Sequence, residues 1–238
     1  MIIEVLGESH LAQTLKRAAT IRGFTVNPHE YGEHYGPDLT FVAEDVYEHN
    51  DAGLSAANGI ANTAVIMASD DDKEVPVVVL SQVPPGWMRS YGETRENVFY
   101  QVDTIIMNSA IERMVHPEQI IVGCLEPSKP LPLAYQEYLL AFECPVLKMS
   151  YESAELAKLA INYFLTAQIT TTNILAGVAE KIGADWNDVA RALHNDKRIG
   201  KYAYLRPGKA NQHLNRDVTT IRVLYDKWTT LREVTRDG

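Results

Sequence analysis

The sequence predicts an α/β protein: a doubly wound, mostly parallel sheet followed by a helical domain built on one long central helix. Two observations predict the sheet. Short β-type runs alternate with segments of helical periodicity, and several runs, such as VPVVVL and QIIVG, are continuously apolar, as in strands that are buried on both faces. A third observation predicts the helix, because apolar side chains recur at helical spacing through the segment that begins at Ser153.

The candidate strands all lie in the first 150 residues, and the segments between them are long enough for crossover helices. They are residues 2–6, 24–27, 39–42, 75–80, 98–101, 119–123 and 145–149. We therefore expect residues 1–150 to form a sheet domain.

The remaining residues, 151–238, are expected to form a helical domain. Ser153 is the expected N-cap of the long helix, and Gly183 is expected to end it. Asp185 opens a second expected helix that runs to His194, and a last helical stretch continues to about Val234.

The length of the first of these helices has a consequence for assembly. A helix of about 30 residues is roughly 45 Å long, which exceeds what one small sheet domain covers. The sequence therefore predicts a homodimer through the long central helix.

The composition argues against several classes of function. The chain has 22 basic and 31 acidic side chains and a formal net charge of −9, which repels nucleic acid and anionic membranes. Two cysteines are too few for a disulfide framework, and no apolar stretch approaches the roughly 20 residues that span a bilayer. No histidine stands at metal-binding spacing. We expect a cytoplasmic protein without a metal, a nucleic-acid partner or a membrane partner.

The segment after the first expected strand has the layout of a dinucleotide-binding turn. Gly7, Ser9, His10 and Leu11 lie between that strand and an amphipathic helix, where a Rossmann-like fold places G-x-G-x-x-G. Ser9 stands at the second glycine, and Asn27 stands where an acidic residue usually binds the ribose. These residues indicate either weakened NAD binding or none.

Two further pairs are candidate site residues. Ser81 and Gln82 follow an apolar strand, at the sheet edge where ligands bind, although a Pro-Pro-Gly turn explains the same residues. Lys158 and Asn162 stand four residues apart on one face of the long helix. That face is either a site for proton transfer or a solvated surface.

A loop near the end of the chain brings several reactive groups together. His213 and Asp217 stand there beside an amide and a guanidinium. A titratable imidazole beside such polar and charged groups is typical of a functional site. The alternative is a polar surface loop.

In this order, the segments resemble the UDP-glucose/GDP-mannose dehydrogenase family. The strongest match is ELAKLAINYFLTAQITTTNILAGVAEKIGADWNDVARAL with the DKRIG and PG segments after it, which is similar to the family's central helical domain. SQVPPG resembles the family's S-T-V-P-P-G loop, and YQVDTIIMNSAIERMVHPEQIIVG resembles its Y-x-P-E-F-L-R-E-G-x-A segment and following strand. The resemblance covers essentially the whole chain, and the family's C-terminal nucleotide-sugar domain is expected to be absent.

The resemblance implies roles for individual residues. Family members use NAD to oxidise a sugar alcohol twice, the second time through a thioester on a loop cysteine. Lys158 and Asn162 match the helix residues that line the substrate, and Asp217 matches the loop aspartate. His213 falls at the nucleophilic cysteine, and Asp103 replaces a catalytic glutamate. Because imidazole cannot form the thioester, the second oxidation is not expected.

The function that follows is an NAD-dependent, two-electron interconversion of alcohol and carbonyl on a sugar or sugar nucleotide. Lys158 and Asn162 would polarise the substrate oxygen, and His213 or Asp217 would move a proton. One alternative is a catalytically silent homologue that serves as a binding or dimerisation module, because the cofactor turn and the loop cysteine have both changed. Another is a 3-hydroxyacid dehydrogenase-like activity, because that arrangement has a similar Lys and Asn spacing.

Overall fold

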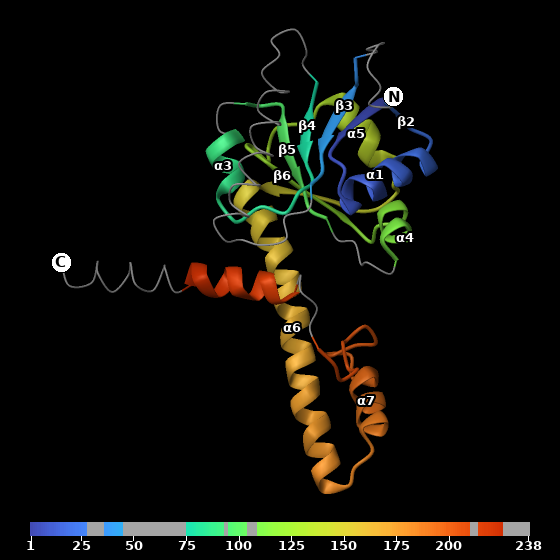
Figure 1. Ribbon diagram of the computed structural model, residues 1–238, viewed down its shortest axis with the longest axis vertical. Coiled ribbons are helices and arrows are strands. Elements are labelled where there is room, and N and C mark those ends of the chain that lie inside the picture. Colours follow the sequence, from blue (N-terminus) through green and yellow to red (C-terminus); the bar gives the residue numbers. More distant parts are fainter. Residues whose placement is uncertain (28–35, 45–74, 93–94, 104–108, 210–213, 226–238) are drawn as a thin grey trace, which may run out of the picture. The chain divides into compact units, whose positions relative to one another are not determined.

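A computed structural model describes residues 1–27, 36–44, 75–92, 95–103, 109–209 and 214–225 (Figure 1). The chain divides into two compact units, Met1–Lys158 and Leu159–Gly238. The boundary falls inside helix α6 (Tyr151–Ile182). The division into domains at residue 150 stays a prediction, because a boundary within one continuous helix does not establish which residues fold independently.

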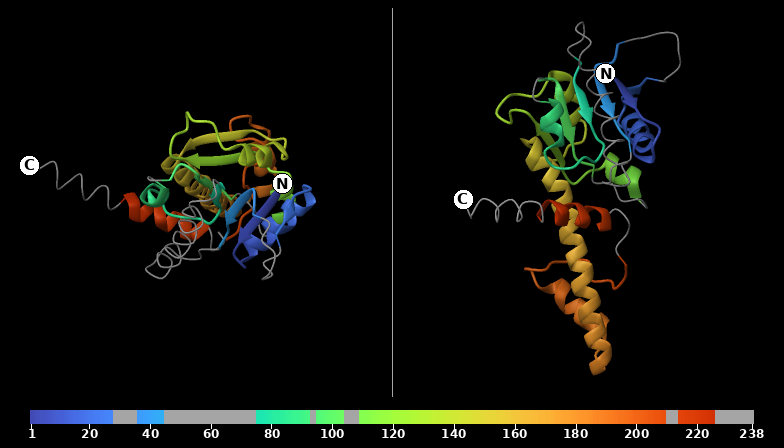
Figure 2. Two further views of the ribbon diagram at one scale, coloured as in Figure 1. Left: turned by 90° about the horizontal axis from the view of Figure 1, so that it is seen from above. Right: turned by 60° about the vertical axis from the view of Figure 1, so that its left-hand side comes forward.

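Within the described part of the first unit, seven strands form one sheet in the order β2-β1-β3-β4-β5-β6-β7. Figure 2 shows the ribbon from two further sides. The strands are β1 (Ile2–Leu6), β2 (Thr25–Val26), β3 (Leu39–Val42), β4 (Val77–Val79), β5 (Val98–Gln101), β6 (Ile120–Cys124) and β7 (Val146–Ser150). Strands β1 to β5 run parallel to one another. Strand β6 is antiparallel to β5, and β7 is parallel to β6. The predicted α/β fold with a mostly parallel sheet is confirmed.

Helices cover both faces of this sheet. Apolar side chains of α1 (His10–Ile21) and α5 (Leu133–Leu140) pack with one set of strand residues, which includes Val78. Side chains of α3 (Trp87–Gly92) and the start of α6 pack with the other set, which includes Val77 and Val79. Successive residues of a strand point to opposite faces, so a continuous apolar run supplies both cores.

The observed strand ends differ slightly from the predicted ones, and proline explains two of the differences. Residues 75–80 were expected as one strand, but β4 begins at Val77, after Pro76. Residues 145–149 were expected as another, but β7 begins at Val146, after Pro145. Proline has no amide proton for the ladder, although the carbonyls of Pro76 and Pro145 still accept hydrogen bonds from the neighbouring strands.

The start of the long helix corrects one expectation. The helix begins at Tyr151, not after Ser153, and the hydroxyl of Ser150 accepts a hydrogen bond from the Ser153 amide at 3.3 Å. Tyr151 is fully buried, and its hydroxyl donates to the Val98 carbonyl at 2.6 Å. Anchoring of Tyr151 against the sheet explains why the helix starts directly at the end of β7.

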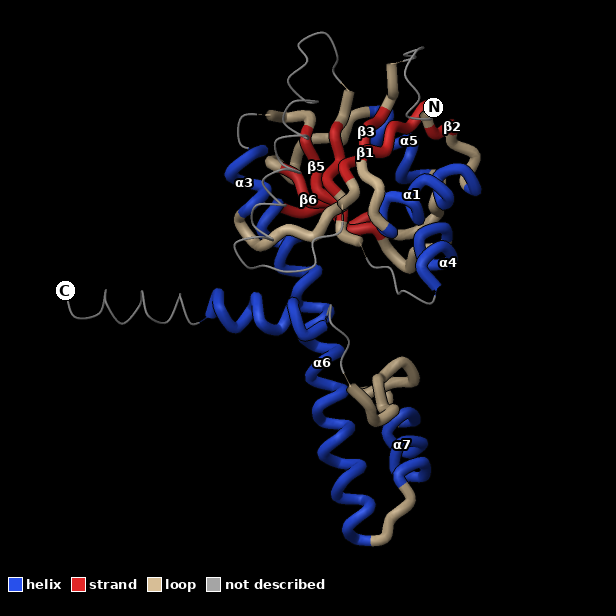
Figure 3. Tube along the Cα trace, viewed as in Figure 1, coloured by secondary structure: helices blue, strands red, loops and turns tan. Residues whose placement is uncertain are grey.

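The second unit contains the rest of α6, helix α7 (Trp186–Asn195) and a helical segment over residues 214–225 (Figure 3). Gly183 ends α6 with a φ of 75°, which glycine adopts readily. The Asp185 carboxylate accepts from the Asn187 amide at 2.8 Å and caps α7. The end of α6 at Gly183 and the start of α7 at Asp185 both agree with the prediction.

The segment between α7 and residue 209 is tied to α6 by side-chain hydrogen bonds. Thr172 donates to the Tyr204 carbonyl at 2.7 Å. The Asn173 side chain pairs with Gly208, donating to its carbonyl at 2.8 Å and accepting from its amide at 2.9 Å. These bonds position the segment immediately before residues 210–213.

The described residues contain neither a membrane-spanning helix nor a metal-binding cluster. No helix among them has the length and apolar character needed to cross a membrane. No group of three or more His, Cys, Asp or Glu side chains in the same ranges is arranged to hold a metal ion.

Candidate functional site

The turn after β1 passes very close to the end of β3. Gly7 has a φ of 129°, and a Cβ atom at this position would lie 2.2 Å from the Ala43 carbonyl oxygen. Any side chain here would therefore clash with the end of β3. Ser9 caps α1 by accepting from the Ala12 amide at 3.3 Å, and its hydroxyl donates to the Ala43 carbonyl at 3.1 Å.

The other residues of this turn differ in their surroundings. His10 is exposed at the start of α1, whereas Leu11 is buried in the core between α1 and the sheet. Asn27 follows β2, and its backbone amide donates a hydrogen bond to the Ile3 carbonyl at 2.9 Å. Leu11 therefore has a packing role, and His10 and Asn27 remain candidates for contact with a cofactor.

A carboxylate that the sequence analysis did not single out lies against this turn. Oε1 of Glu44 accepts a hydrogen bond from the Glu8 amide at 3.0 Å. The Glu44 amide donates to the hydroxyl of the fully buried Ser81 at 2.7 Å. The loop that starts at Ser81 thus positions a residue at the turn after β1.

In a dinucleotide-binding fold, the turn after β1 is the place where the pyrophosphate of NAD binds. Backbone amides at a helix start bind phosphate, and glycine allows its close approach. Gly7 and the capped start of α1 provide this backbone. The backbone of the turn therefore fits a pyrophosphate group in shape. One of its amides, that of Glu8, already donates a hydrogen bond to the Glu44 carboxylate.

The other end of the Ser81–Gly86 loop is held by a buried carboxylate. Glu155 of α6 is completely buried and accepts hydrogen bonds from the amides of Gly86 at 2.6 Å and Met88 at 2.7 Å. Burial raises the pKa of Glu155 to about 7, although the two amides oppose the shift. Gln82, in the same loop, is nearly buried.

Glu155 was missed in the sequence, although a signal was present. Tyr151, Glu155 and Leu159 follow one another at intervals of four residues, and all three are fully buried. A carboxylate on an otherwise apolar helical face needs a partner. The sequence does not reveal that this partner is the backbone of the Ser81–Gly86 loop.

Lys158 and Asp103 meet in the first unit. The Lys158 ammonium donates to the Asp103 carbonyl and lies 3.7 Å from its carboxylate. Only 11% of the Lys158 side chain and 17% of the Asp103 side chain are exposed. Asp103 comes just after β5, so the structure brings together two residues that the resemblance assigned to catalysis.

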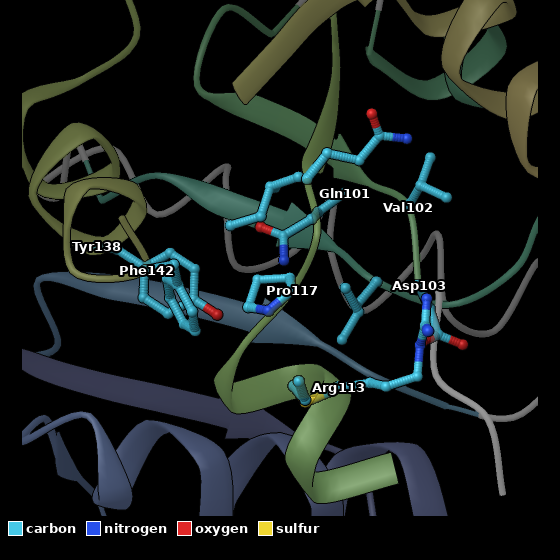
Figure 4. Close-up of a pocket in the computed structure, with 11 residues that line it drawn as sticks. Gln101, Val102, Asp103, Arg113, Pro117, Tyr138 and Phe142 are labelled. Carbon is cyan, nitrogen blue, oxygen red and sulfur yellow. The ribbon is translucent and has the colours of Figure 1, made fainter. Parts of the chain in front are cut away.

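A small cavity lies beside this pair (Figure 4). It has a volume of about 30 Å³ and is lined by residues that include Gln101, Asp103, Arg113, Tyr138 and Phe142. Figure 4 shows the Arg113 side chain extending toward Asp103. A volume of this size holds about one water molecule, so the cavity does not accommodate a sugar.

Asn162 and Asp217 meet in the second unit. The Asn162 amide donates to the Asp217 carboxylate, and Arg216 Nε donates to the same carboxylate at 2.8 Å. Asp217 is completely buried. Leu214, Asp217 and Thr220 form the buried face of the helical segment 214–225, so Asp217 lies in a helix and not in a loop as expected.

The second unit also has a cavity of about 310 Å³. Its lining includes three basic side chains, His194, Arg206 and Lys209, together with the apolar Ile169 and Leu205. A cavity of this size suits a small ligand or part of one. His213, the expected proton carrier, lies outside the described residues.

Comparisons with known proteins show which family the chain resembles. Residues 152–229 match the UDP-glucose/GDP-mannose dehydrogenase family, central domain. The chain is 28% identical over 180 residues to UDP-glucose 6-dehydrogenase YwqF of Bacillus subtilis, a match that covers 72% of this chain and 40% of the relative.

Solved structures show the same fold. A UDP-glucose dehydrogenase from Pyrobaculum islandicum has a TM-score of 0.73 at 20% identity, over 96% of this chain and 64% of that one. A 3-hydroxyisobutyrate dehydrogenase of Mycobacterium tuberculosis has a TM-score of 0.66 at 10% identity, over 96% and 87%. The fold alone therefore does not separate the two kinds of dehydrogenase.

The sequence comparisons separate them. The chain spans less than two thirds of the length of YwqF and of the Pyrobaculum islandicum protein, but its central helical region matches one family directly. Residues 152–229 therefore match the central domain of the UDP-glucose/GDP-mannose dehydrogenase family, and the chain is similar to members of that family.

Proposed function

We propose that the chain is a nucleotide-sugar dehydrogenase-like oxidoreductase that binds NAD(H) and interconverts an alcohol and a carbonyl in one two-electron step. The observation that carries this proposal is the Lys158 ammonium, which is largely buried beside Asp103 at the end of β5. A cation held in this way supplies a directed donor for a substrate oxygen. NAD, when bound at the turn after β1, would accept the hydride.

Each of the other candidate residues has a defined role in this proposal. Asn162 is assigned to substrate binding. Asp217 orients the Asn162 side chain through the bond between them, and His213 carries the proton. Since His213 supplies no thiol, the proposed reaction stops at the aldehyde.

The proposed substrate is a sugar or sugar nucleotide. Its support is the cavity of about 310 Å³ in the second unit, because Arg206 and Lys209 line it and cationic side chains suit a phosphate group. The free thiols Cys124 and Cys144 support the proposed cytoplasmic location.

The test is an assay of NADH formation with NAD and UDP-glucose, with separate detection of aldehyde and acid products. We expect slow aldehyde formation that falls at least about a hundredfold in Lys158→Ala. Lys181→Ala is the matched control, because Lys181 lies exposed in the last turn of the same helix. Unchanged turnover in Lys158→Ala would contradict the assigned role.

A catalytically silent homologue is the second candidate. It is favoured by the Glu44 carboxylate, which lies at the turn after β1. It is also favoured by the hydrogen bonds that the Asp217 carboxylate already accepts from Asn162 and Arg216. Failure of wild-type protein to bind NADH at millimolar concentration would favour it. A 3-hydroxyacid dehydrogenase-like activity is the third candidate, and a panel of small hydroxyacids in the same assay distinguishes it.

We also propose the homodimer along α6. Its support is the exposure of large apolar side chains of α6 in the second unit, including Phe164 at 71%, Ile174 at 63% and Ile182 at 73%. Isolated soluble monomers rarely expose such a row of apolar groups.

A further inference from the structure

We propose that the carboxylate of Glu44 is an internal occupant of the pyrophosphate-binding turn, which a dinucleotide must displace in order to bind. The inference rests on the proposed function, because NAD(H) is the ligand expected at this turn. It assigns Glu44 the role of setting the affinity for the cofactor.

The first support is the position of the carboxylate. Oε1 of Glu44 lies 3.0 Å from the amide nitrogen of Glu8. The same oxygen lies 2.9 Å from the position that a Cβ atom at Gly7 would take. The carboxylate therefore lies directly against the backbone that a pyrophosphate would approach.

The second support is the way Glu44 is held. It follows β3 by two residues, and its own amide donates to the buried Ser81 hydroxyl at 2.7 Å. The carbonyl of Ala43, the residue before Glu44, accepts a hydrogen bond from the Ser9 hydroxyl at 3.1 Å. Backbone bonds on both sides thus fix the point from which the Glu44 side chain reaches the turn.

The third support is charge. The carboxylate satisfies the Glu8 amide and brings a negative charge to a place where the ligand is itself negative. A pyrophosphate and a carboxylate at neighbouring positions repel each other. The hydrogen bond between Glu8 and Glu44 is exposed to solvent, so that the side chain can leave the turn without disturbing the core.

The experiment compares wild type with Glu44→Gln and Glu44→Ala by calorimetric titration with NADH and, separately, with inorganic pyrophosphate. Gln keeps an acceptor for the Glu8 amide without the charge, whereas Ala removes both. We expect both variants to bind each probe at least about tenfold more tightly than wild type. The Glu8 amide resonance should shift when pyrophosphate is added to either variant.

Asp38→Asn is the matched control. The Asp38 carboxylate also accepts from a backbone amide, that of Ile2 at 2.7 Å, but at the opposite end of β1. Its removal changes the net charge by the same amount and should leave the affinity for both probes within about twofold. Thermal unfolding of each variant verifies that it is folded.

The outcomes separate the inference from the proposed function. Wild type that binds NADH, with Gln and Ala variants that bind no more tightly, overturns the inference and keeps the function. Variants that gain pyrophosphate affinity but never bind NADH uphold the inference and overturn NAD(H) as the ligand. Absence of binding of either probe to every variant overturns both.

Discussion

The carboxylate of Glu155 accepts a hydrogen bond from the amide of Gly86 at 2.6 Å, across 69 positions of the sequence. The bond connects the start of α6 to the loop that follows β4. Ser81, at the other end of this loop, accepts a hydrogen bond from the Glu44 amide, so Glu155 and Glu44 both bond to the segment that follows β4.

The protonation of Glu155 predicts how stability depends on pH. Burial raises its pKa from 4.5 to about 7, so the folded state keeps a proton that the unfolded state releases. The stabilisation is therefore complete below about pH 4.5 and is lost as pH rises toward 7, by on the order of 3 kcal/mol at most. Urea unfolding across this range measures it.

Glu155→Gln is the variant that isolates this effect. It keeps one of the two oxygens that accept from the amides of Gly86 and Met88 and does not titrate, so its stability should vary less between pH 4.5 and 7. A slope as steep as that of wild type would show that another group is responsible. Glu152 does not interfere in this range. Arg89 lowers its pKa to about 2, so its contribution to the pH dependence of stability lies below about pH 4.5.

Gly7→Ala should destabilise the first unit. The φ of 129° and the 2.2 Å approach to the Ala43 carbonyl impose strain and a clash, which together cost about 2–4 kcal/mol. Equilibrium unfolding in urea gives the value. Gly177→Ala on α6 is the control, because it meets nothing within 4 Å and should gain about 1 kcal/mol of helix propensity. Equal effects of the two substitutions would contradict the prediction.

Asp217→Asn should destabilise the second unit by about 2–4 kcal/mol, because it leaves the largely buried Arg216 without its carboxylate. The matched variant is Asp188→Asn, which breaks a pair whose Arg191 side chain is 73% exposed and should change stability by less than about 1 kcal/mol. Thermal unfolding of both variants tests the contrast. A loss for Asp217→Asn no larger than that of the control would mean that Asp217 does not support the fold.

Phe164→Glu should shift the proposed dimer toward monomer. Phe164 is 71% exposed on α6, and a charge there opposes burial against a second copy. Sedimentation velocity at micromolar concentration reads the mass directly. Glu180→Gln, on an exposed part of the same helix, should leave the mass unchanged, and a wild-type mass equal to one chain would exclude the dimer under those conditions.

The sequence by itself determined the elements that depend on near neighbours. Apolar runs predicted the strands, Asp185 predicted the cap of α7, and Gly183 predicted the end of α6, because each signal acts within a few residues. Even the need for glycine at position 7 followed from the layout of strand, turn and helix.

Only the tertiary structure decided which groups meet at the candidate site. Glu8 and Glu44 are 36 positions apart, and Asn162 and Asp217 are 55 apart. No local pattern encodes such a pair, because its geometry depends on how strands and helices pack around it. The resemblance to a family named several of these residues, but the carboxylates of Glu44 and Glu155 acquire their roles from the backbone amides that packing places beside them.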